Sequence, residues 1–430
     1  MNKLMFAAAA VLTAAACSHS TGFSSEEMDA MASELQERLA GIREKVIRPA
    51  EGYLKHEYLI PAGFYKQMWD WDGYFMGYYW RENGRPDLLQ SWALNLLEGI
   101  DERGYVCGCA TVNGPRVMHG SFSMKPFLSQ GIVLACEGLG DWSWVEPWYE
   151  KTCRALAFRD STQFDPDYGL YYWENGFQSG ADNNVALNYY KGDTRSFVAA
   201  DCSTMQLREF KAQARIARKL GHIEDAESFS ARAEALAKAI NQHLWCAEDK
   251  CYYNIDRSTG AFYKRVSYSC FWPLFEGLAP INEGRAMLKA HMFNPKEMRS
   301  DYGFRTLSAS DPDYNNKNII KPFSNWQGPV WVIASYIYSV GLHRYGFDRE
   351  AAWMTGKLGE LVLDDLRKYN TTHECWSAET GEPLSPAFSY VDENGRFIGF
   401  ISWNLLLELM FDTAVNGTPH LMEISFPLEG

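Results

Sequence analysis

The chain has 430 residues, which is enough for one large domain or two of ordinary size. A hydrophobic fraction of 47% excludes a disordered or fibrous protein. The net charge is −13 and the sequence holds no Lys/Arg cluster, which argues against a nucleic-acid-binding surface. Aromatic residues make up 15% of the chain, more than a core of Leu, Ile and Val requires.

The first residues have the pattern of an export signal. Lys3 supplies a positive charge, residues 6–16 form an apolar run too short to span a bilayer, and three alanines precede Cys17. We therefore predict a bacterial lipoprotein that is lipid-anchored at Cys17 in the cell envelope, facing the periplasm or held at the outer membrane. An ordinary signal peptide is the alternative. The predicted division is 1–17 signal peptide, 18–25 tether and 26–430 one folded domain.

Helical spacing of apolar residues dominates the rest of the chain. The first helix has apolar residues three or four apart over 28–46 and ends at Pro49. Two further helices meet at Gly221, and a later one begins after Pro329, a residue that suits the first helical turn. The predicted helices are 28–46, 88–100, 205–220, 225–245, 330–342, 351–369 and 402–411.

Strand signals are few. The clearest is a hairpin of 251–255 and 261–265 around the turn sequence Asp-Arg-Ser-Thr-Gly. The sequence has no alternating strand–helix pattern, no GxGxxG segment and no P-loop, which excludes a nucleotide-binding α/β fold. No Pro/Ser-rich linker divides the chain, so we predict one mostly helical domain.

Nine of the ten cysteines follow Cys17, and their odd number leaves at least one without a partner in the chain. Cys246 and Cys251 flank a predicted turn and could form a disulfide in an oxidising periplasm; the alternative is that all nine are packing thiols. Cys107 and Cys109 are too close in sequence for a typical metal pair, and neither a zinc signature nor an EF-hand loop is present. We therefore predict no metal and no cofactor.

Four loops rich in Trp, Asp, Asn and Gly join the predicted helices, and loops on a rigid scaffold often carry function. In the first, Trp69 and Trp71 alternate with Asp70 and Asp72. An indole ring can cover the CH-rich face of a sugar while a neighbouring carboxylate takes two hydroxyl groups. The alternative is that the Trp residues are core and the Asp residues cap a helix.

The second loop, 176–187, holds Asp182 and Asn183. An Asp in a partly dry pocket keeps a raised pKa and can act as an acid, although Asp-Asn-Asn is also ordinary turn chemistry. The third loop, 325–331, combines indole rings with amide side chains just before a helix. This combination suits a platform on which a sugar stacks; the alternative is a helix start with buried aromatic residues. Its candidate binding residues are Trp326, Gln327, Gly328 and Trp331.

The fourth loop, 372–382, places Glu374 beside His373, where its carboxylate could hold a water molecule as a general base. Trp376 is the adjacent candidate for sugar binding. No HExxH segment is present, which excludes a typical zinc hydrolase, and no GxSxG elbow supports a serine hydrolase. Cys375 and His373 are too close in sequence to form a useful pair of thiol nucleophile and base.

Taken together, these segments resemble the trehalase-like and processing-glucosidase-like enzymes of glycoside hydrolase family 63. The resemblance extends from about residue 60 to residue 411 in the family's order, and several motifs in order are more specific than any one of them. The motifs are Trp-Asp-Trp-Asp at 69–72, Ser-Gly-x-Asp-Asn at 179–183, Asn-Trp-x-Gly-Pro-x-Trp at 325–331, a Glu followed by Thr-Gly at 374–381, and Ser-Trp at 402–403.

The resemblance implies an all-α fold, an (α/α)6 toroid with short β-hairpins in its loops, as a single catalytic domain over 26–430. It implies an exo-acting inverting hydrolase of a small α-glucoside, with Asp182 as general acid and Glu374 as general base. Inverting enzymes separate two such carboxyl groups by roughly 6.5–9.5 Å to admit a water molecule. Asp70 and Asp72 would accept hydrogen bonds from sugar hydroxyl groups, and Trp403 would line the sugar site.

The chain also departs from the family pattern. After Asn183 it reads Asn-Val-Ala-Leu in place of Ser-Pro-Arg-Trp, so an expected Arg is missing and the exact sugar is left open. Met124 and Lys125 stand where relatives favour Gln and Pro. Lys125 is a candidate to meet an anionic group of the substrate, with a solvated side chain as the alternative.

Two other functions compete with hydrolysis of a glucoside. A lyase or unsaturated-uronyl hydrolase on a similar toroid would need Arg or Lys beside a uronate, whereas these loops offer Asp and Glu. A non-catalytic glycan-binding lipoprotein would keep the sugar site without turnover, which the presence of both Asp182 and Glu374 disfavours. The expected partner is a small oligosaccharide or glycoside, with no nucleic acid, and with membrane contact only through the lipid on Cys17.

Overall fold

The computed structural model describes residues 22–63, 65–116, 123–187, 194–318, 324–384, 394 and 398–424. The predicted lipidation site Cys17 lies outside the described residues. Across the described residues, no helix combines the length and apolar character needed to cross a membrane.

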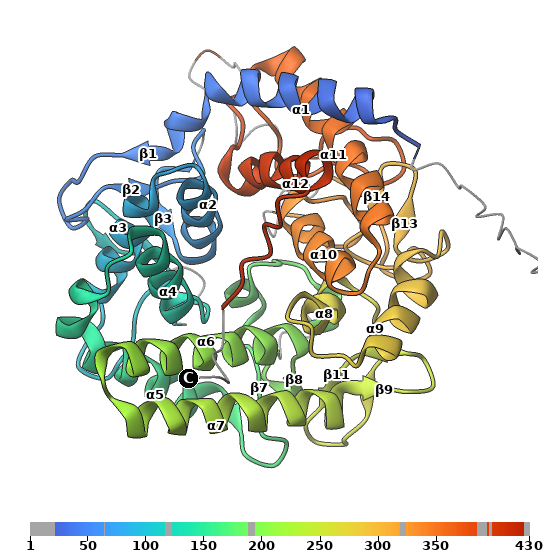
Figure 1. The fold of residues 1–430 in the computed structure, drawn as a ribbon. Coiled ribbons are helices and arrows are strands. Elements are labelled where there is room, and N and C mark those ends of the chain that lie inside the picture. The colour runs from blue at the N-terminus through green and yellow to red at the C-terminus, as the bar shows by residue number, and fades with distance from the viewer. Residues whose placement is uncertain are drawn as a thin grey trace, which may run out of the picture.

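Twelve α-helices of the described chain form two concentric rings of six, which confirms the predicted (α/α)6 toroid (Figure 1). The chain alternates between the rings, so each outer helix is followed by an inner one. The outer helices are α1 (Ser25–Ala40), α3 (Pro86–Glu98), α5 (Tyr149–Gln163), α7 (Ile223–Ala239), α9 (Ile281–Met287) and α11 (Asp348–Tyr369). The inner helices are α2 (Asp70–Glu82), α4 (Leu128–Leu139), α6 (Ala200–Leu220), α8 (Trp272–Phe275), α10 (Val332–Arg344) and α12 (Leu406–Asn416).

The two ends of the toroid differ in the length of their connections. An inner helix passes to the next outer helix through a short turn, such as 83–85 after α2 or 345–347 after α10. An outer helix passes to the next inner helix through a long connection, such as 99–127 before α4 or 370–405 before α12. The long connections therefore gather at the N-termini of the inner helices.

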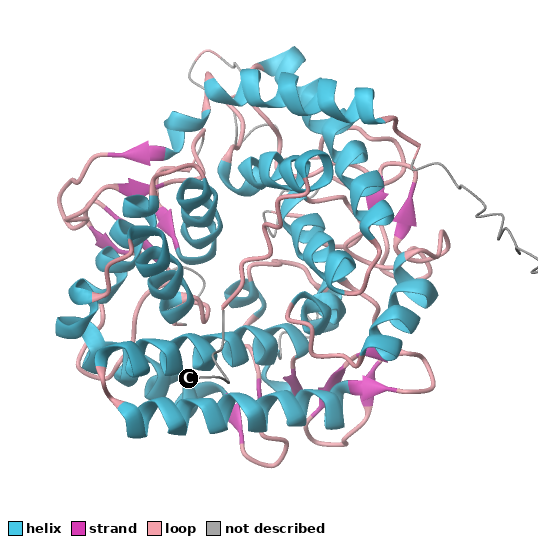
Figure 2. Ribbon diagram, viewed as in Figure 1, coloured by secondary structure: helices cyan, strands magenta, loops and turns pink. Residues whose placement is uncertain are grey.

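The strands are short, antiparallel and confined to the long connections (Figure 2). They brace these connections without building a layer of the fold. Three two-stranded pairs are β1 (Ile47–Arg48) with β2 (Tyr58–Leu59), β6 (Phe164–Asp165) with β7 (Leu170–Tyr171), and β13 (Arg299–Ser300) with β14 (Gly303–Phe304). A fourth is β9 (Trp245–Cys246) with β10 (Cys251–Tyr252). One three-stranded sheet consists of β3 (Met68–Trp69), β4 (Cys109–Thr111) and β5 (Gly114–Pro115). The other consists of β8 (Phe197–Val198), β11 (Asn254–Asp256) and β12 (Phe262–Tyr263).

Several predicted boundaries need correction. The first predicted helix stops at Ala40, and residues 43–46 form a separate 3₁₀ turn. Most of the predicted loop 67–75 is the start of α2, whose residues from Asp70 to Trp80 are all buried and so lack one-sided spacing. The predicted hairpin pairs only β11 with β12, because residues 251–252 pair with β9 instead.

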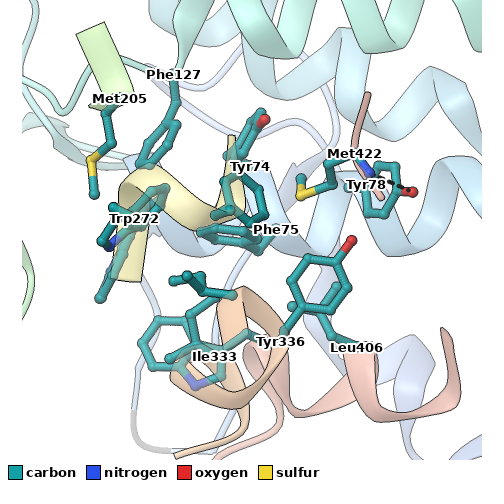
Figure 3. Close-up of a cluster of buried hydrophobic side chains, with 14 of the residues drawn as sticks. Tyr74, Phe75, Tyr78, Phe127, Met205, Trp272, Ile333, Tyr336, Leu406 and Met422 are labelled. Carbon is teal, nitrogen blue, oxygen red and sulfur yellow. Dashed lines mark hydrogen bonds between the residues drawn. The ribbon is translucent and has the colours of Figure 1, made fainter. Parts of the chain in front are cut away.

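The axis of the toroid is filled by aromatic side chains (Figure 3). Tyr74 of α2 stacks on Phe127 with ring centres 4.6 Å apart, and Phe127 in turn meets Trp272 of α8. The C-terminal segment 417–424 closes the end with short connections: Met422 is buried there, and its carbonyl accepts a hydrogen bond from Arg208 of α6. The toroid is thus packed along its axis and sealed at one end.

Arg208 offers a stability test of this sealed end. Its guanidinium pairs with the Glu276 carboxylate, and the two side chains are 1% and 5% exposed, respectively. It also donates hydrogen bonds to the side chain of Gln130 and to the carbonyl of Met422. Arg208→Met is expected to lower the free energy of unfolding by about 3 kcal/mol, because it leaves a buried carboxylate undercompensated. Urea unfolding checks this. Arg103→Met, which breaks an exposed ion pair with Asp101, should change the midpoint little; equal losses would contradict the assignment.

All nine cysteines after Cys17 are free thiols in the structure. Cys246 and Cys251 face each other directly across β9 and β10, so the pairing considered from the sequence places them as neighbours without a bond. The nine are mostly buried and serve as packing groups.

Candidate active site

The predicted site residues gather at the end with long connections, around the N-termini of the inner helices. Asp70 and Asp72 lie in the first turn of α2, and Trp331 immediately precedes α10. Trp403 lies in a 3₁₀ turn, Ser402–Leu405, that leads into α12. Helix N-termini carry partial positive charge, which favours carboxylates at this end of the toroid.

Asp70 is held on both of its carboxylate oxygens. Its Oδ1 accepts hydrogen bonds from the backbone N–H of Trp71 at 2.7 Å and from the ammonium of Lys125 at 3.0 Å. Its Oδ2 accepts from the backbone N–H of Lys125 at 2.7 Å. The Lys125 side chain is only 5% exposed, so the alternative of a solvated lysine is wrong.

Asp72 is buried and accepts a hydrogen bond from the hydroxyl of Ser402 at 2.8 Å. Burial raises the pKa of this carboxyl to about 7, against the opposing effects of Ser402 and Lys125. Ser402 has a positive φ of 29°, and its backbone N–H donates to the carbonyl of Pro61. The backbone strain at Ser402 thus brings a hydroxyl to Asp72.

Asp182 follows a 3₁₀ turn, Gly176–Ser179, and its Oδ2 accepts a hydrogen bond from the hydroxyl of Ser324 at 2.7 Å. Burial raises the pKa of this carboxyl to about 7, opposed by Ser324 and Lys125. Gly180 has a φ of 82°, and a Cβ there would lie 2.6 Å from the Trp71 ring. Only glycine lets the loop of Asp182 approach Trp71 this closely.

The amides of Asn183 and Gln327 join two of the site loops. Asn183 Oδ1 accepts from the backbone N–H of Trp326 at 2.6 Å, and Gln327 Nε2 donates to the Asn183 carbonyl at 3.1 Å. A Cβ at Gly328 would lie 2.6 Å from the Asn315 carbonyl, so this residue permits close packing of the loop. These contacts fix the loop of Asp182 against the segment before α10.

Four tryptophans form what we term the indole cluster: Trp71, Trp326, Trp331 and Trp403. Trp326 stacks on Trp331 with ring centres 4.3 Å apart, and Trp71 lies 5.9 Å from Trp326 and 5.1 Å from Trp403. The predicted loops that contribute them are far apart in sequence. Their rings therefore make one continuous apolar wall between the loop of Asp182 and the start of α12.

Glu374 is 5% exposed. Its Oε1 accepts a hydrogen bond from the hydroxyl of Tyr65 at 3.3 Å. The backbone of Trp376 pairs with Val330, the neighbour of Trp331, through bonds of 2.8 and 3.0 Å. This bridge joins the segment that carries Glu374 to the segment that carries Trp326 and Trp331.

The remaining predicted residues lie at the edge or in the frame of the site. Trp69 is partly exposed and its ring meets Tyr65 edge-on at 6.4 Å, whereas Trp376 is 1% exposed. His373 bonds Asp365 through Nδ1 at 2.8 Å. Burial raises the pKa of the Cys375 thiol well above its usual range, which disfavours a thiolate nucleophile.

The structure adds three residues that sequence reasoning did not assign: Tyr65, Ser324 and Ser402. The two serines lie inside or beside recognised motifs, but a serine in a loop carries no signal of its own. Tyr65 contacts a residue 309 positions later in the chain. One grouping of potential metal ligands occurs in the part of the chain that the structure describes, Cys246, Glu248 and Asp249, and Lys264 pairs with Asp249 there at 2.8 Å.

The (α/α)6 toroid is the fold shared with six-hairpin glycosidases, and acidic side chains and the indole cluster gather at its long-connection end. A profile of the mannosylglycerate hydrolase MGH1-like glycoside hydrolase domain matches residues 65–391, and the chain belongs to this family. It is accordingly a glycoside hydrolase of the family 63 type.

Similar proteins include a mannosylglycerate hydrolase and several trehalases. A mannosylglycerate hydrolase of Rubrobacter radiotolerans is 32% identical over 139 residues, which are 32% of this chain and 30% of that protein. A periplasmic trehalase of Salmonella schwarzengrund is 22% identical over 407 residues, covering 79% of this chain and 67% of that protein. The match thus spans less than a third of the Rubrobacter protein.

Solved structures of a mannosylglycerate hydrolase and of a trehalase share the fold of this chain. The mannosylglycerate hydrolase of Thermus thermophilus in complex with glucose has a TM-score of 0.66 at 16% identity, covering 89% of this chain and 100% of that chain. The neutral trehalase of Saccharomyces cerevisiae has a TM-score of 0.63 at 14% identity, covering 85% of this chain and 74% of that chain. At these identities the likeness establishes the shared fold.

Proposed function

We propose that the protein is an exo-acting inverting hydrolase of a small α-glucoside, with Asp182 as general acid and Glu374 as general base. The observation that carries the proposal is the environment of Asp182. Burial holds its pKa at about 7, so a large fraction of the carboxyl is protonated at neutral pH and able to donate.

In this mechanism Asp182 protonates the glycosidic oxygen as the bond to the sugar breaks. Glu374 takes a proton from a water molecule that attacks the opposite face of the sugar ring, and Tyr65 orients the Glu374 carboxylate by its hydrogen bond. Asp70 and Asp72 bind sugar hydroxyl groups, and the indole cluster packs against the apolar face of the sugar. The lyase alternative lacks support, since the ammonium of Lys125 is already paired with Asp70.

A substrate panel with a stereochemical readout tests the proposal. The panel holds trehalose, mannosylglycerate and aryl α-glucosides, and NMR follows the first-formed sugar. We expect hydrolysis of at least one α-glucoside, with the β-anomer appearing first from an aryl α-glucoside and equal amounts of α- and β-glucose from trehalose, whose leaving group is itself α-glucose. The α-anomer as the first sugar from an aryl α-glucoside would exclude inversion, and turnover of mannosylglycerate alone would exclude the glucoside. Sugar binding without turnover of any compound would favour the glycan-binding alternative.

The cell-envelope location is a separate part of the proposal. Several trehalases similar to this chain are periplasmic by name, and the sequence before Cys17 has the lipoprotein pattern. We expect the full-length protein to sediment with membranes and Cys17→Ser to shift it to the soluble fraction. Membrane association that survives this change would contradict anchoring through Cys17.

A further inference from the structure

Lys125 is a buried cation within the candidate site. It contacts Asp70 twice, through its ammonium at 3.0 Å and its backbone N–H at 2.7 Å. The ammonium also lies 5.1 Å from the centre of the Trp71 ring, and a Cβ on Gly180 would lie 2.9 Å from Lys125 Cε. Lys125 therefore fills the space between α2 and the loop that carries Asp182.

Buried polar contacts fix the backbone on which Lys125 lies. Arg159 of α5 donates to the carbonyl of Met124, and Gln178 Nε2 donates to the carbonyl of Ser123 at 3.1 Å. Gln178 belongs to the 3₁₀ turn just before the proposed general acid, so the segment of Lys125 and the acid's loop are tied together. A lysine held this way has little freedom to move its charge during turnover.

The charge of Lys125 acts on several groups at once. Burial raises the pKa of both Asp72 and Asp182, and Lys125 opposes the rise at each. Three carboxyl groups lie around it, those of Asp70, Asp72 and Asp182. The thiols of Cys107 and Cys109 lie near Asp70, and the phenol of Tyr268 lies near Asp182. Arg159 and Glu209 line a cavity of about 30 Å³ together with Lys125.

We propose that Lys125 is a positioning residue: it holds the Asp70 side chain through two contacts and supplies the positive charge near which Asp182 acts as an acid. The proposal rests on the proposed role of Asp182. It predicts that the ammonium and the Asp70 carboxylate act on the proton of Asp182 in opposite directions, which a purely structural lysine would not do.

The test is the pH dependence of kcat/KM for wild type, Lys125→Met, Asp70→Asn and the double variant. Lys125→Met removes a nearby positive charge and leaves Asp70 uncompensated. The alkaline limb of its kcat/KM profile, where activity falls as the general acid loses its proton, should therefore move to higher pH by about one unit. Asp70→Asn leaves the ammonium unpaired, so its limb should move down. The double variant removes both charges and should return close to wild type, whatever its absolute rate.

Lys66→Met is the matched control, because it makes the same charge change at an exposed residue near the site. Its limb should not move, since solvent screens the charge. A fixed limb in Lys125→Met, or shifts of the same sign in Lys125→Met and Asp70→Asn, overturns the role of Lys125. If Lys125→Met does not fold, an unshifted or raised limb in Asp70→Asn overturns it instead. Retained activity in Asp182→Asn would instead overturn the proposed function.

Discussion

Asp182→Asn is expected to lower kcat for an unactivated α-glucoside by about 10²–10⁴-fold, the usual contribution of a general acid. Asparagine keeps the size of the side chain but has no proton to give to the leaving oxygen. Initial rates on the best substrate of the panel measure the loss. A glucosyl fluoride needs no protonation of its leaving group, so the variant should lose far less activity on that substrate. Near-native turnover of the unactivated glucoside would disprove the assignment.

The same variant has a predictable effect on stability. The folded-state pKa of Asp182 is about 7 and its ordinary value is 3.8, so the folded protein binds more protons between these values and loses stability as pH rises through that window. Asp182→Asn removes this loss. Its Tm should exceed that of wild type at pH 8 and differ less at pH 4, and a lower Tm at pH 8 would contradict burial of a titrating carboxyl.

Glu374→Gln is expected to lower kcat by a similar factor of about 10²–10⁴, because the attacking water no longer has a base. Unlike the acid variant, it should be equally impaired on a glucosyl fluoride. Azide attacks without losing a proton, so it should restore part of the turnover and give a glucosyl azide of inverted configuration. Product analysis by NMR distinguishes these outcomes.

Glu379→Gln is the control for Glu374→Gln. Glu379 lies in the same loop, but its carboxylate accepts hydrogen bonds from Arg305 at 3.1 Å and from the hydroxyl of Tyr314. Its kcat should stay close to wild type. A comparable loss in both variants would indicate that the loop, and not the Glu374 carboxylate, is responsible.

Helices were predictable where apolar residues are spaced on one face or where a residue type marks a helix end. The outer helices α3, α7 and α11 show spaced apolar residues, and Gly221 adopts the left-handed conformation that ends α6. The inner helices α2 and α10 are both buried on all sides, which erases the helical periodicity; Pro329 marked the start of α10, but no such residue marks α2, which was missed. Turn residues alone could not predict the partner of Cys251, because strand pairing depends on contacts across the sheet.

The site was predictable at the level of motifs but not of contacts. Asp182 and Glu374 stand in recognisable segments. Ser402 lies in the Ser-Trp motif and Ser324 lies beside the motif at 325–331, but neither pattern indicates that the hydroxyl would contact Asp72 or Asp182. The burial of Lys125 was unexpected because lysine is almost never buried without a partner, and its partner Asp70 lies 55 positions earlier in the chain. The spacing of residues along the sequence does not predict the contact between Lys125 and Asp70.

The sealed end of the toroid has a kinetic consequence. Because the segment 417–424 and the aromatic layer around Tyr74 block the axis, we expect the substrate and both products of the proposed reaction to pass through the end with long connections. In the proposed exo-acting hydrolase, the sugar ring would lie deeper than the group attached to it, so we expect the leaving group to depart before the free sugar. Product release would then be ordered, and the free monosaccharide would be the product that competes with incoming substrate.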